Sequence, residues 1–240
     1  MNRTYPALCL SAILAALVAV SFAWTDSAVI RLDNGTTTVN APPRETKPLR
    51  NSELVDVTRI DGNFKLDVRY ATANNFTGRA VYPEARVFLQ RPAAEALARA
   101  HRRVHQQGFG MILFDGYRPW SVTKLFWDVT PAAKKEFVAD PAVGSRHNRG
   151  CAIDLALCDL ATSAPVPMPS GYDEMTSRSY PHYTGGSEES RRNRDVLRAA
   201  MEAEGFTVYP SEWWHFDYGD YAKYPIMNAS FAELDGGSGK

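Results

Sequence analysis

Residues 145–154 constrain the fold and the chemistry of this chain more than any other stretch. They place His147 in a loop rich in glycine and arginine, and Asp154 inside the apolar run 152–157, which is typical of a buried strand. Because a buried carboxylate without a partner is costly, a cation or a salt bridge has to compensate its charge. The nearby imidazole favours a divalent metal ion. The alternative for a single histidine in such a place is a structural, hydrogen-bonded side chain.

A second motif, residues 211–215, supplies the groups that are still needed for a metal site. It contains His215 and, three residues before it, Glu212. Together with His147 and Asp154, His215 makes three protein ligands. This leaves the fourth position of a zinc ion for water and leaves Glu212 to act on that water. The sequence therefore predicts one catalytic zinc ion per subunit.

The composition is that of a soluble globular protein with one main domain. The 240 residues are 45% hydrophobic and 22% charged, and the formal net charge is zero. A balanced charge implies no basic face, so nucleic acid is not expected as a partner.

The N-terminus has the pattern of a secretory signal. Arg3 precedes residues 7–23, which contain no charged side chain, and Ser21 and Ala23 are small residues at the positions that a signal peptidase reads. We expect cleavage after Ala23 and an exported protein, either periplasmic or secreted. The alternative is an uncleaved membrane anchor, for which the apolar run is short.

The remainder of the chain divides into three parts. Residues 24–50 mix polar residues and prolines without periodicity and are predicted to form a flexible linker. Residues 51–234 are predicted to form the zinc domain. The tail, 235–240, is rich in glycine and serine and is predicted to be flexible.

Periodicity and end signals within the domain predict an α+β fold, with a small central antiparallel sheet flanked by helices and a zinc cleft on one face. The order of the strands in the sheet does not follow from the sequence. The predicted strands are 64–70, 109–114, 152–157 and 206–209, the last of which leads into Glu212 and His215. The predicted helices are 92–107, 121–129 (with Ser121 as N-cap), 131–138 and 187–204.

Two other pairs of potential ligands are not assigned to the metal. His101 and His105 are one helical turn apart, but no carboxylate accompanies them, and we expect both to be exposed to solvent. Cys151 and Cys158 lie at the two ends of one predicted strand, roughly 23 Å apart. Because a disulfide cannot span that distance, we expect two free, buried thiols.

Arg118 belongs to a turn, residues 115–119, that follows the strand 109–114. At this position its guanidinium is placed either to act on a substrate or to pair with Asp115 and hold the turn. The residues alone leave both roles open.

Five segments together resemble the D-alanyl-D-alanine dipeptidases, the zinc peptidase family that includes the vancomycin-resistance dipeptidase. They occur in the family's order across residues 54–225. The two zinc motifs alone indicate the wider group of D,D-carboxypeptidases and related cell-wall peptidases, whereas segments 70–78 and 168–175 narrow the resemblance to the dipeptidases. The segments are 70–78, 115–119, Ser145-x-His147-x-x-Gly150-x-Ala152-x-Asp154, 168–175 and Glu212-Trp-Trp-His215.

The resemblance implies a D,D-peptidase or hedgehog-like fold and zinc-dependent hydrolysis of D-Ala-D-Ala. It implies that the zinc ligands are His147, Asp154 and His215, that Glu212 is the general acid and base, and that Arg118 stabilises the developing oxyanion. It also implies a substrate-binding role for three residues around the dipeptide, with the ammonium group of the substrate on the last: Tyr70, Ser145 and Asp173.

Two alternatives to the dipeptidase remain. A D,D-carboxypeptidase or endopeptidase acting on peptidoglycan stems shares the zinc site but needs an open groove, and Asp173 argues against it. A non-catalytic zinc module would not need Glu212. We expect a small dipeptide as the substrate, no protein partner, and no stable membrane association after signal cleavage. An exported enzyme cannot reach the cytoplasmic dipeptide pool, so we expect a role in cell-wall dipeptide turnover or scavenging.

Overall fold

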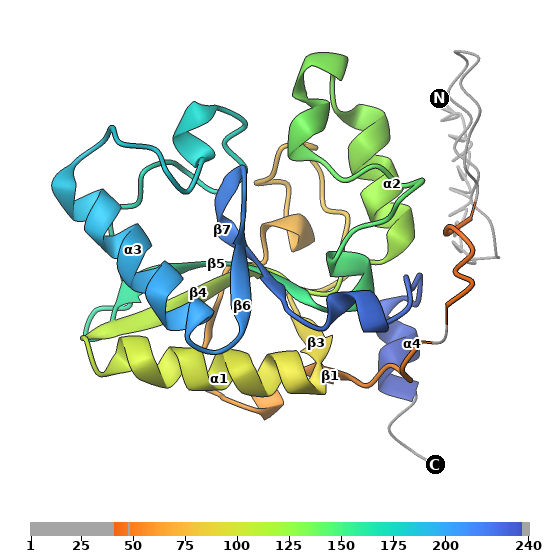
Figure 1. Ribbon diagram of the computed structural model, residues 1–240, viewed down its shortest axis with the longest axis horizontal. Coiled ribbons are helices and arrows are strands. Elements are labelled where there is room, and N and C mark those ends of the chain that lie inside the picture. Colours follow the sequence, from red (N-terminus) through yellow and green to blue (C-terminus); the bar gives the residue numbers. More distant parts are fainter. Residues whose placement is uncertain (1–40, 48, 237–240) are drawn as a thin grey trace, which may run out of the picture. The chain divides into compact units, whose positions relative to one another are not determined.

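The computed structural model describes residues 41–47 and 49–236 (Figure 1). The predicted signal peptide, residues 24–40 of the predicted linker and residues 237–240 of the predicted tail lie outside this part of the chain. Among the residues that are described, no helix is both long enough and apolar enough to cross a membrane.

A five-stranded sheet carries the site, with the strand order β2-β4-β5-β7-β6. Neighbouring strands are antiparallel except for β2 and β4, which are parallel. The α+β fold with a mainly antiparallel central sheet is therefore confirmed, and the parallel edge strand is an addition to it. The strands are β2 (Lys65–Leu66), β4 (Phe109–Asp115), β5 (Ala152–Asp159), β6 (Phe206–Tyr209) and β7 (Glu212–Tyr218).

The strand predicted at residues 64–70 is much shorter than expected, because β2 contains only Lys65–Leu66. The chain then enters a 3-10 turn, η2 (Arg69–Ala71), in which Tyr70 is buried. The carbonyl oxygen of Tyr70 accepts hydrogen bonds from the backbone of Val81 and Tyr82, at 2.8 and 2.9 Å. The backbone at Tyr70 is thus paired with residues 81 and 82 and not with a strand of the sheet.

Two long helices pack against each other and against the sheet (Figure 1). They are α1 (Arg91–His105) and α3 (Glu188–Glu202), close to the predicted ranges. The side chain of Ser187 caps α3 by accepting a hydrogen bond from the backbone of Ser190. Leu97 of α1 and Leu197 of α3 are fully buried, as are Leu155 and Phe216 of the sheet. These apolar faces form the core and leave the opposite face of the sheet for the site.

Helix α2 (Trp120–Val129) agrees with the prediction except at its start. Pro119 occupies the N-cap position, and Ser121 does not cap the helix. Instead, the backbone N–H of Ser121 donates to the side chain of Asn228 at 2.8 Å. The segment predicted as helix 131–138 is a 3-10 helix, η3 (Ala132–Phe137).

The remaining elements are short. Strands β1 and β3 pair as a separate antiparallel two-stranded sheet. The bounds are β1 (Leu54–Asp56), η1 (Val57–Arg59), β3 (Phe88–Gln90), η4 (His147–Arg149), η5 (Ser177–Ser179), η6 (Tyr221–Lys223) and α4 (Phe231–Gly236).

The last part of the predicted linker contacts the domain. Glu45 pairs with Arg149 at 2.7 Å and accepts a hydrogen bond from the backbone of Ile226 at 2.8 Å. Arg50 pairs with Asp220 at 2.7 Å. Specific contacts to the domain thus begin before residue 51, and α4 continues to Gly236, into the segment predicted as the tail.

His101 is buried, so the prediction that it is exposed is wrong. Its Nδ1 lies 2.8 Å from Oδ2 of Asp61, and its ring stacks on Phe64 with the ring centroids 4.7 Å apart. The loop that leads into β2 covers this side of the helix, which the helical pattern alone does not reveal. Cys151 and Cys158 are free and buried, as expected.

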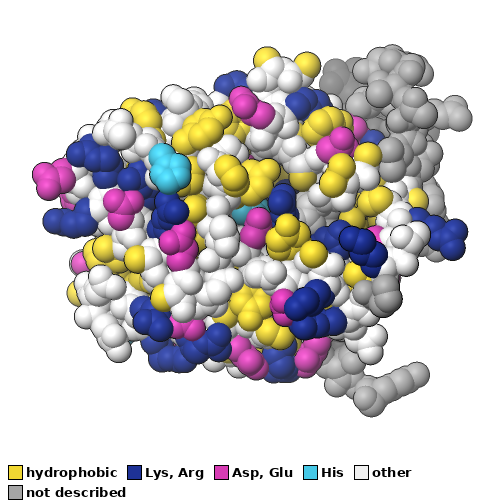
Figure 2. Space-filling model, viewed as in Figure 1, with side chains coloured by type: hydrophobic (Ala, Val, Ile, Leu, Met, Phe, Trp, Pro, Cys, Tyr) yellow, Lys and Arg dark blue, Asp and Glu magenta, His cyan; other side chains and the backbone are white. Residues whose placement is uncertain are grey.

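Acidic and basic side chains are interspersed on the face of the molecule shown in Figure 2. This distribution agrees with the net charge of zero. No patch of one sign that would suit a polyanion dominates this face.

Candidate active site

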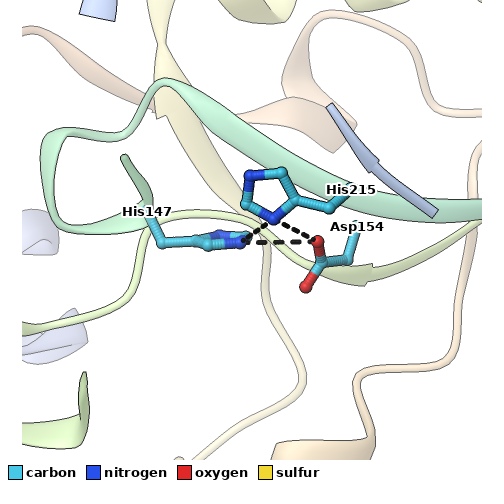
Figure 3. Close-up of side chains that lie close together, drawn as sticks. All are labelled: His147, Asp154 and His215. Carbon is cyan, nitrogen blue, oxygen red and sulfur yellow. Dashed lines mark hydrogen bonds and ion pairs between the residues drawn. The ribbon is translucent and has the colours of Figure 1, made fainter. Parts of the chain in front are cut away.

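Three side chains from separate segments meet with their ligand atoms in a triangle (Figure 3). Nε2 of His147 lies 3.1 Å from Nδ1 of His215 and 3.4 Å from Oδ1 of Asp154. Nδ1 of His215 lies 3.1 Å from the same oxygen of Asp154. These are the three residues predicted as zinc ligands, and all three are buried.

The dimensions of this triangle suit a tetrahedral zinc ion. Zinc bonds to nitrogen and oxygen of about 2.0–2.1 Å place neighbouring ligand atoms of a tetrahedron about 3.3–3.4 Å apart. Moreover, Oδ1 of Asp154 is a buried side-chain oxygen without a hydrogen-bond partner among the described residues. A buried acceptor of this kind is costly unless a cation satisfies it.

Hydrogen bonds on the far side of each ring fix the tautomers of both histidines. Nδ1 of His147 donates to the carbonyl oxygen of Gly116 at 2.7 Å, since a carbonyl can only accept. Nε2 of His215 donates to Oδ1 of Asp217 at 2.9 Å. In the neutral form of each ring, which is the form that binds a metal, the lone pairs of Nε2 of His147 and Nδ1 of His215 therefore point at each other and at a carboxylate oxygen. This arrangement of lone pairs is repulsive without a cation and is the usual outer shell of a zinc site.

The carboxylates around the triangle also favour a positive charge at its centre. Burial lowers the pKa of His215, but the neighbouring carboxylates of Asp154 and Asp217 outweigh burial and hold this pKa well above its ordinary value. A divalent ion satisfies the same demand.

The sheet positions two of the ligands directly. Asp154 of β5 is the register partner of His215 in β7, so their side chains lie on the same face of the sheet. His147 arrives from η4, a 3-10 turn that ends at Gly150 with φ of +66°. The positive φ favours glycine here, and a Cβ atom at Gly150 would lie 2.3 Å from Cδ2 of Leu54 in β1 and 3.3 Å from the backbone nitrogen of Gln90.

Arg118 pairs with Asp115, which is one of the two roles that the sequence left open, and it also lies close to the ligand triangle. Its Nε and Nη2 donate to Oδ2 of Asp115 at 2.9 and 2.7 Å, which holds the turn. The same Nη2 lies 3.9 Å from Oδ2 of Asp154. The hydroxyl of Tyr82 also donates to Asp115, at 2.8 Å, so the guanidinium is fixed next to the metal centre.

Glu212 lies beside the ligand triangle without belonging to it. Its Oε2 is 3.6 Å from Nδ1 of His215. Burial, together with the negative charges of Asp154 and Asp173, raises the pKa of Glu212 to about 8. A carboxyl group with a pKa near neutrality both accepts and donates a proton at physiological pH, as a general base and acid must.

Tyr70, Ser145 and Asp173 line the same cleft as the ligands. The hydroxyl of Tyr70 donates to Oδ2 of Asp173 at 2.8 Å, and Oγ of Ser145 accepts from the backbone of His147 at 3.2 Å. Burial and then the charge of Asp154 raise the pKa of Asp173 to about 7. Asp173 has φ of +59°, an uncommon conformation for a residue with a side chain.

Sequence reasoning missed three groups that support the ligands. These are Asp217, the carbonyl of Gly116 and Tyr172, whose hydroxyl donates to Oδ2 of Asp154 at 3.1 Å. Asp217 had a detectable signal, because it follows His215 by two residues in a strand and so shares its face. Nothing in the sequence marks a backbone carbonyl as a partner.

Comparisons with known proteins agree with this site. A family model described as D-ala-D-ala dipeptidase matches residues 50–234. The D-alanyl-D-alanine dipeptidase of Escherichia coli (strain K12) is 36% identical over 181 residues, which cover 75% of this chain and 92% of that protein. The D-alanyl-D-alanine dipeptidase of Enterococcus faecium is 38% identical over 168 residues, which cover 62% of this chain and 83% of that protein.

Among solved structures, the chain matches a vancomycin-resistance D,D-dipeptidase in complex with a D-Ala-D-Ala phosphinate analogue. The match has a TM-score of 0.34 and 19% sequence identity, and it covers 62% of this chain and 54% of that one.

Proposed function

The chain belongs to the D-Ala-D-Ala dipeptidase family of zinc-dependent peptidases, and on this basis we propose that it hydrolyses D-Ala-D-Ala to two molecules of D-alanine outside the cytoplasm. The observation that carries the proposal is the convergence of two imidazole lone pairs and one carboxylate oxygen next to Glu212. A protein that only binds zinc would need the three ligand atoms but would not need Glu212.

His147, Asp154 and His215 would hold the zinc ion, which when bound lowers the pKa of a coordinated water and polarises the substrate carbonyl. The protein's own groups perform the proton transfers. Glu212 takes a proton from the attacking water as the bond from oxygen to the carbonyl carbon forms. It then gives that proton to the amide nitrogen as the C–N bond breaks, which releases D-alanine with a free amine.

Arg118 is the group placed to stabilise the negative charge that develops on the carbonyl oxygen. Asp115 and Tyr82 hold its turn, so the guanidinium needs little reorganisation during the reaction. A preorganised donor of this kind typically contributes about 100- to 1000-fold in rate.

The substrate termini meet groups of suitable chemistry. Asp173, fixed by Tyr70, is an acceptor for the ammonium group of the dipeptide. Ser145 offers a hydroxyl beside His147 in the lining of the cleft. A longer or N-blocked peptide would leave Asp173 buried without its cation, and this penalty favours a free dipeptide.

The site of action is proposed from the N-terminal sequence. Arg3 and the uncharged run 7–23 support export, and an exported enzyme acts on dipeptides released from the cell wall, in turnover or scavenging. A glycopeptide challenge tests this role: cells that express the full-length protein should gain no protection, and clear protection would contradict it.

The activity is tested on three substrates with the zinc content of each preparation known. These are D-Ala-D-Ala, N-acetyl-D-Ala-D-Ala and a pentapeptide stem, each incubated with the wild type and Glu212→Ala. We expect hydrolysis of the free dipeptide alone, and loss of that hydrolysis in Glu212→Ala with zinc retained. Cleavage of the blocked or longer substrates would instead indicate a D,D-carboxypeptidase or endopeptidase and would withdraw Asp173 as the ammonium partner.

A further inference from the structure

Arg146 is a second arginine in the cleft, and the mechanism above does not use it. It lies between Ser145 and His147 in the sequence and lines the same cleft as the metal ligands and Glu212. Among the described residues that line the cleft, Arg118 and Arg146 are the only arginines, and no lysine lines it.

The two arginines differ in how far they are already committed. Arg118 has a side chain only 10% exposed and uses both Nε and Nη2 on Asp115. Arg146 is 37% exposed, and its Nε lies 3.3 Å from Oδ2 of Asp217. Since a guanidinium carries five N–H donors, Arg146 has donors left to pair with a carboxylate while it remains on Asp217 and on the side chain of Tyr221.

Two aromatic rings hold the Arg146 guanidinium in place. Its central carbon lies 5.4 Å from the ring centroid of Tyr209 and 5.1 Å from that of Tyr221. Cation–π contacts and the ion pair to Asp217 limit the motion of a long side chain, so less entropy is lost when it binds an anion.

Arg146 and Asp173 contact different tyrosines of the cleft lining. Asp173 is held by Tyr70, whose ring faces the Arg118 guanidinium at 5.6 Å. Arg146 contacts Tyr209, whose ring lies 5.0 Å from that of His215.

A dipeptide is a zwitterion whose scissile carbonyl lies between an ammonium and a carboxylate. If Asp173 accepts the ammonium group, the carboxylate at the other end of the substrate needs a positively charged partner other than the zinc ion. Arg146 is that cation among the lining residues, because Arg118 is already paired and is assigned to the oxyanion.

We propose that Arg146 binds the C-terminal carboxylate of the substrate and so makes the enzyme selective for peptides that end in a free acid at the cleaved residue. This inference rests on the proposed dipeptidase activity. It makes Arg146 a specificity-determining residue, separate from proton transfer and from metal binding.

The test compares D-Ala-D-Ala with D-Ala-D-alaninamide, in which the carboxylate is neutral. The proteins are the wild type, Arg146→Gln, Arg146→Lys and the control Arg192→Gln, an exposed arginine of α3. We expect Arg146→Gln to raise KM for the acid by about 10- to 100-fold, the effect of losing a charged hydrogen bond. Its kcat and its kinetics on the amide should change little, Arg146→Lys should recover part of the loss, and the control should match the wild type.

Zinc affinity, measured by competition with a chromophoric chelator, separates this role from a structural one. Arg146→Gln should bind zinc as tightly as the wild type. Equal losses on acid and amide, or weaker zinc binding with a lower kcat, would mean that Arg146 only holds Asp217, and would overturn the inference.

The outcome also distinguishes this inference from the proposed function. If the wild type cleaves D-Ala-D-Ala but Arg146→Gln keeps the preference for the acid, only the carboxylate-binding role is wrong. If the wild type cleaves neither substrate, both proposals are wrong.

Discussion

Nε2 of His215 lies 2.9 Å from Oδ1 of Asp217, two residues further along the same strand. Because this contact fixes the tautomer, it directs the lone pair of Nδ1 at the metal position. We expect Asp217→Ala to weaken zinc binding by about 10- to 100-fold, as is typical when an outer-shell partner of a zinc-ligating histidine is removed. Chelator competition measures the effect, with Asp195→Asn, an exposed residue of α3, as the control. Unchanged zinc affinity in Asp217→Ala would show that the ring is held without this contact.

Zinc should stabilise the folded protein, because the triangle of ligand atoms is unfavourable without a cation. A ligand present at 100 times its Kd stabilises the native state by about 2.7 kcal/mol. Calorimetry with and without a chelator should show a higher Tm for the zinc-bound protein. The shift should vanish in His147→Ala, and a shift that persists in this variant would place the stabilising zinc elsewhere.

The pH dependence of kcat/KM should report Asp173, whose pKa burial raises to about 7. Below that pH the carboxyl is protonated and no longer attracts the ammonium of the substrate, so kcat/KM should fall as the pH decreases through 7. Asp173→Asn should have a lower kcat/KM at pH 8 and should lose the part of this fall that Asp173 causes, so that only the dependence on Glu212, whose pKa is about 8, remains. An unchanged profile in Asp173→Asn would exclude the residue as the ammonium partner.

The raised pKa of Asp173 also makes the stability of the fold depend on pH. Stability should fall as the pH rises, whereas kcat/KM should increase. Asp173 holds its proton more tightly in the folded state than in the unfolded state, where the pKa is about 3.9. Its contribution to stability is therefore complete below pH 4 and is lost as the pH rises through 7. Relative to the wild type, Asp173→Asn should gain Tm between pH 5 and pH 8. Thermal unfolding at both values measures this difference, and no gain would contradict the raised pKa.

Arg118 should affect both catalysis and stability. Arg118→Ala should lower kcat by about 100- to 1000-fold through loss of the oxyanion donor. It should also destabilise the fold by about 3–5 kcal/mol, because Asp115 is then a buried charge without its partner. The double variant Asp115→Asn/Arg118→Ala should recover stability but not kcat. Recovery of both would mean that Arg118 acts only by holding the turn.

Gly150 should tolerate no larger residue. In Gly150→Ala the new Cβ would lie 2.3 Å from Cδ2 of Leu54, at a φ of +66°. We expect a loss of more than about 1 kcal/mol in unfolding free energy and weaker zinc binding, since the loop that carries His147 must shift. In a Leu54→Ala background the clash is absent and only the backbone strain remains. Gly150→Ala should therefore lower the unfolding free energy less in that background than in the wild type. Wild-type stability in Gly150→Ala would contradict this account.

The candidate ligands can be predicted from the sequence alone, and so can the loop that carries His147 and the strand that carries Asp154. The spacing of His147 and Asp154, the apolar run after Gly150 and the pairing of Glu212 with His215 depend on local chemistry and on the period of a strand, and both can be read along a chain. Helices α1 and α3 were predicted for the same reason, from an apolar face and clear end signals.

How these parts meet depends on the packing of the folded chain. The β5–β7 register places Asp154 opposite His215, and a register irregularity between Val208 and Tyr209 lies where β6 meets the first residue of β7, Glu212, which lines the cleft. Without it, a spacing of three in a strand would put Glu212 and His215 on opposite faces. The burial of His101 by Asp61, the shortening of β2 and the approach of Arg146 to Asp217 likewise join segments distant in sequence or separated by a turn. Such contacts depend on the packing of whole elements, and no local pattern encodes them.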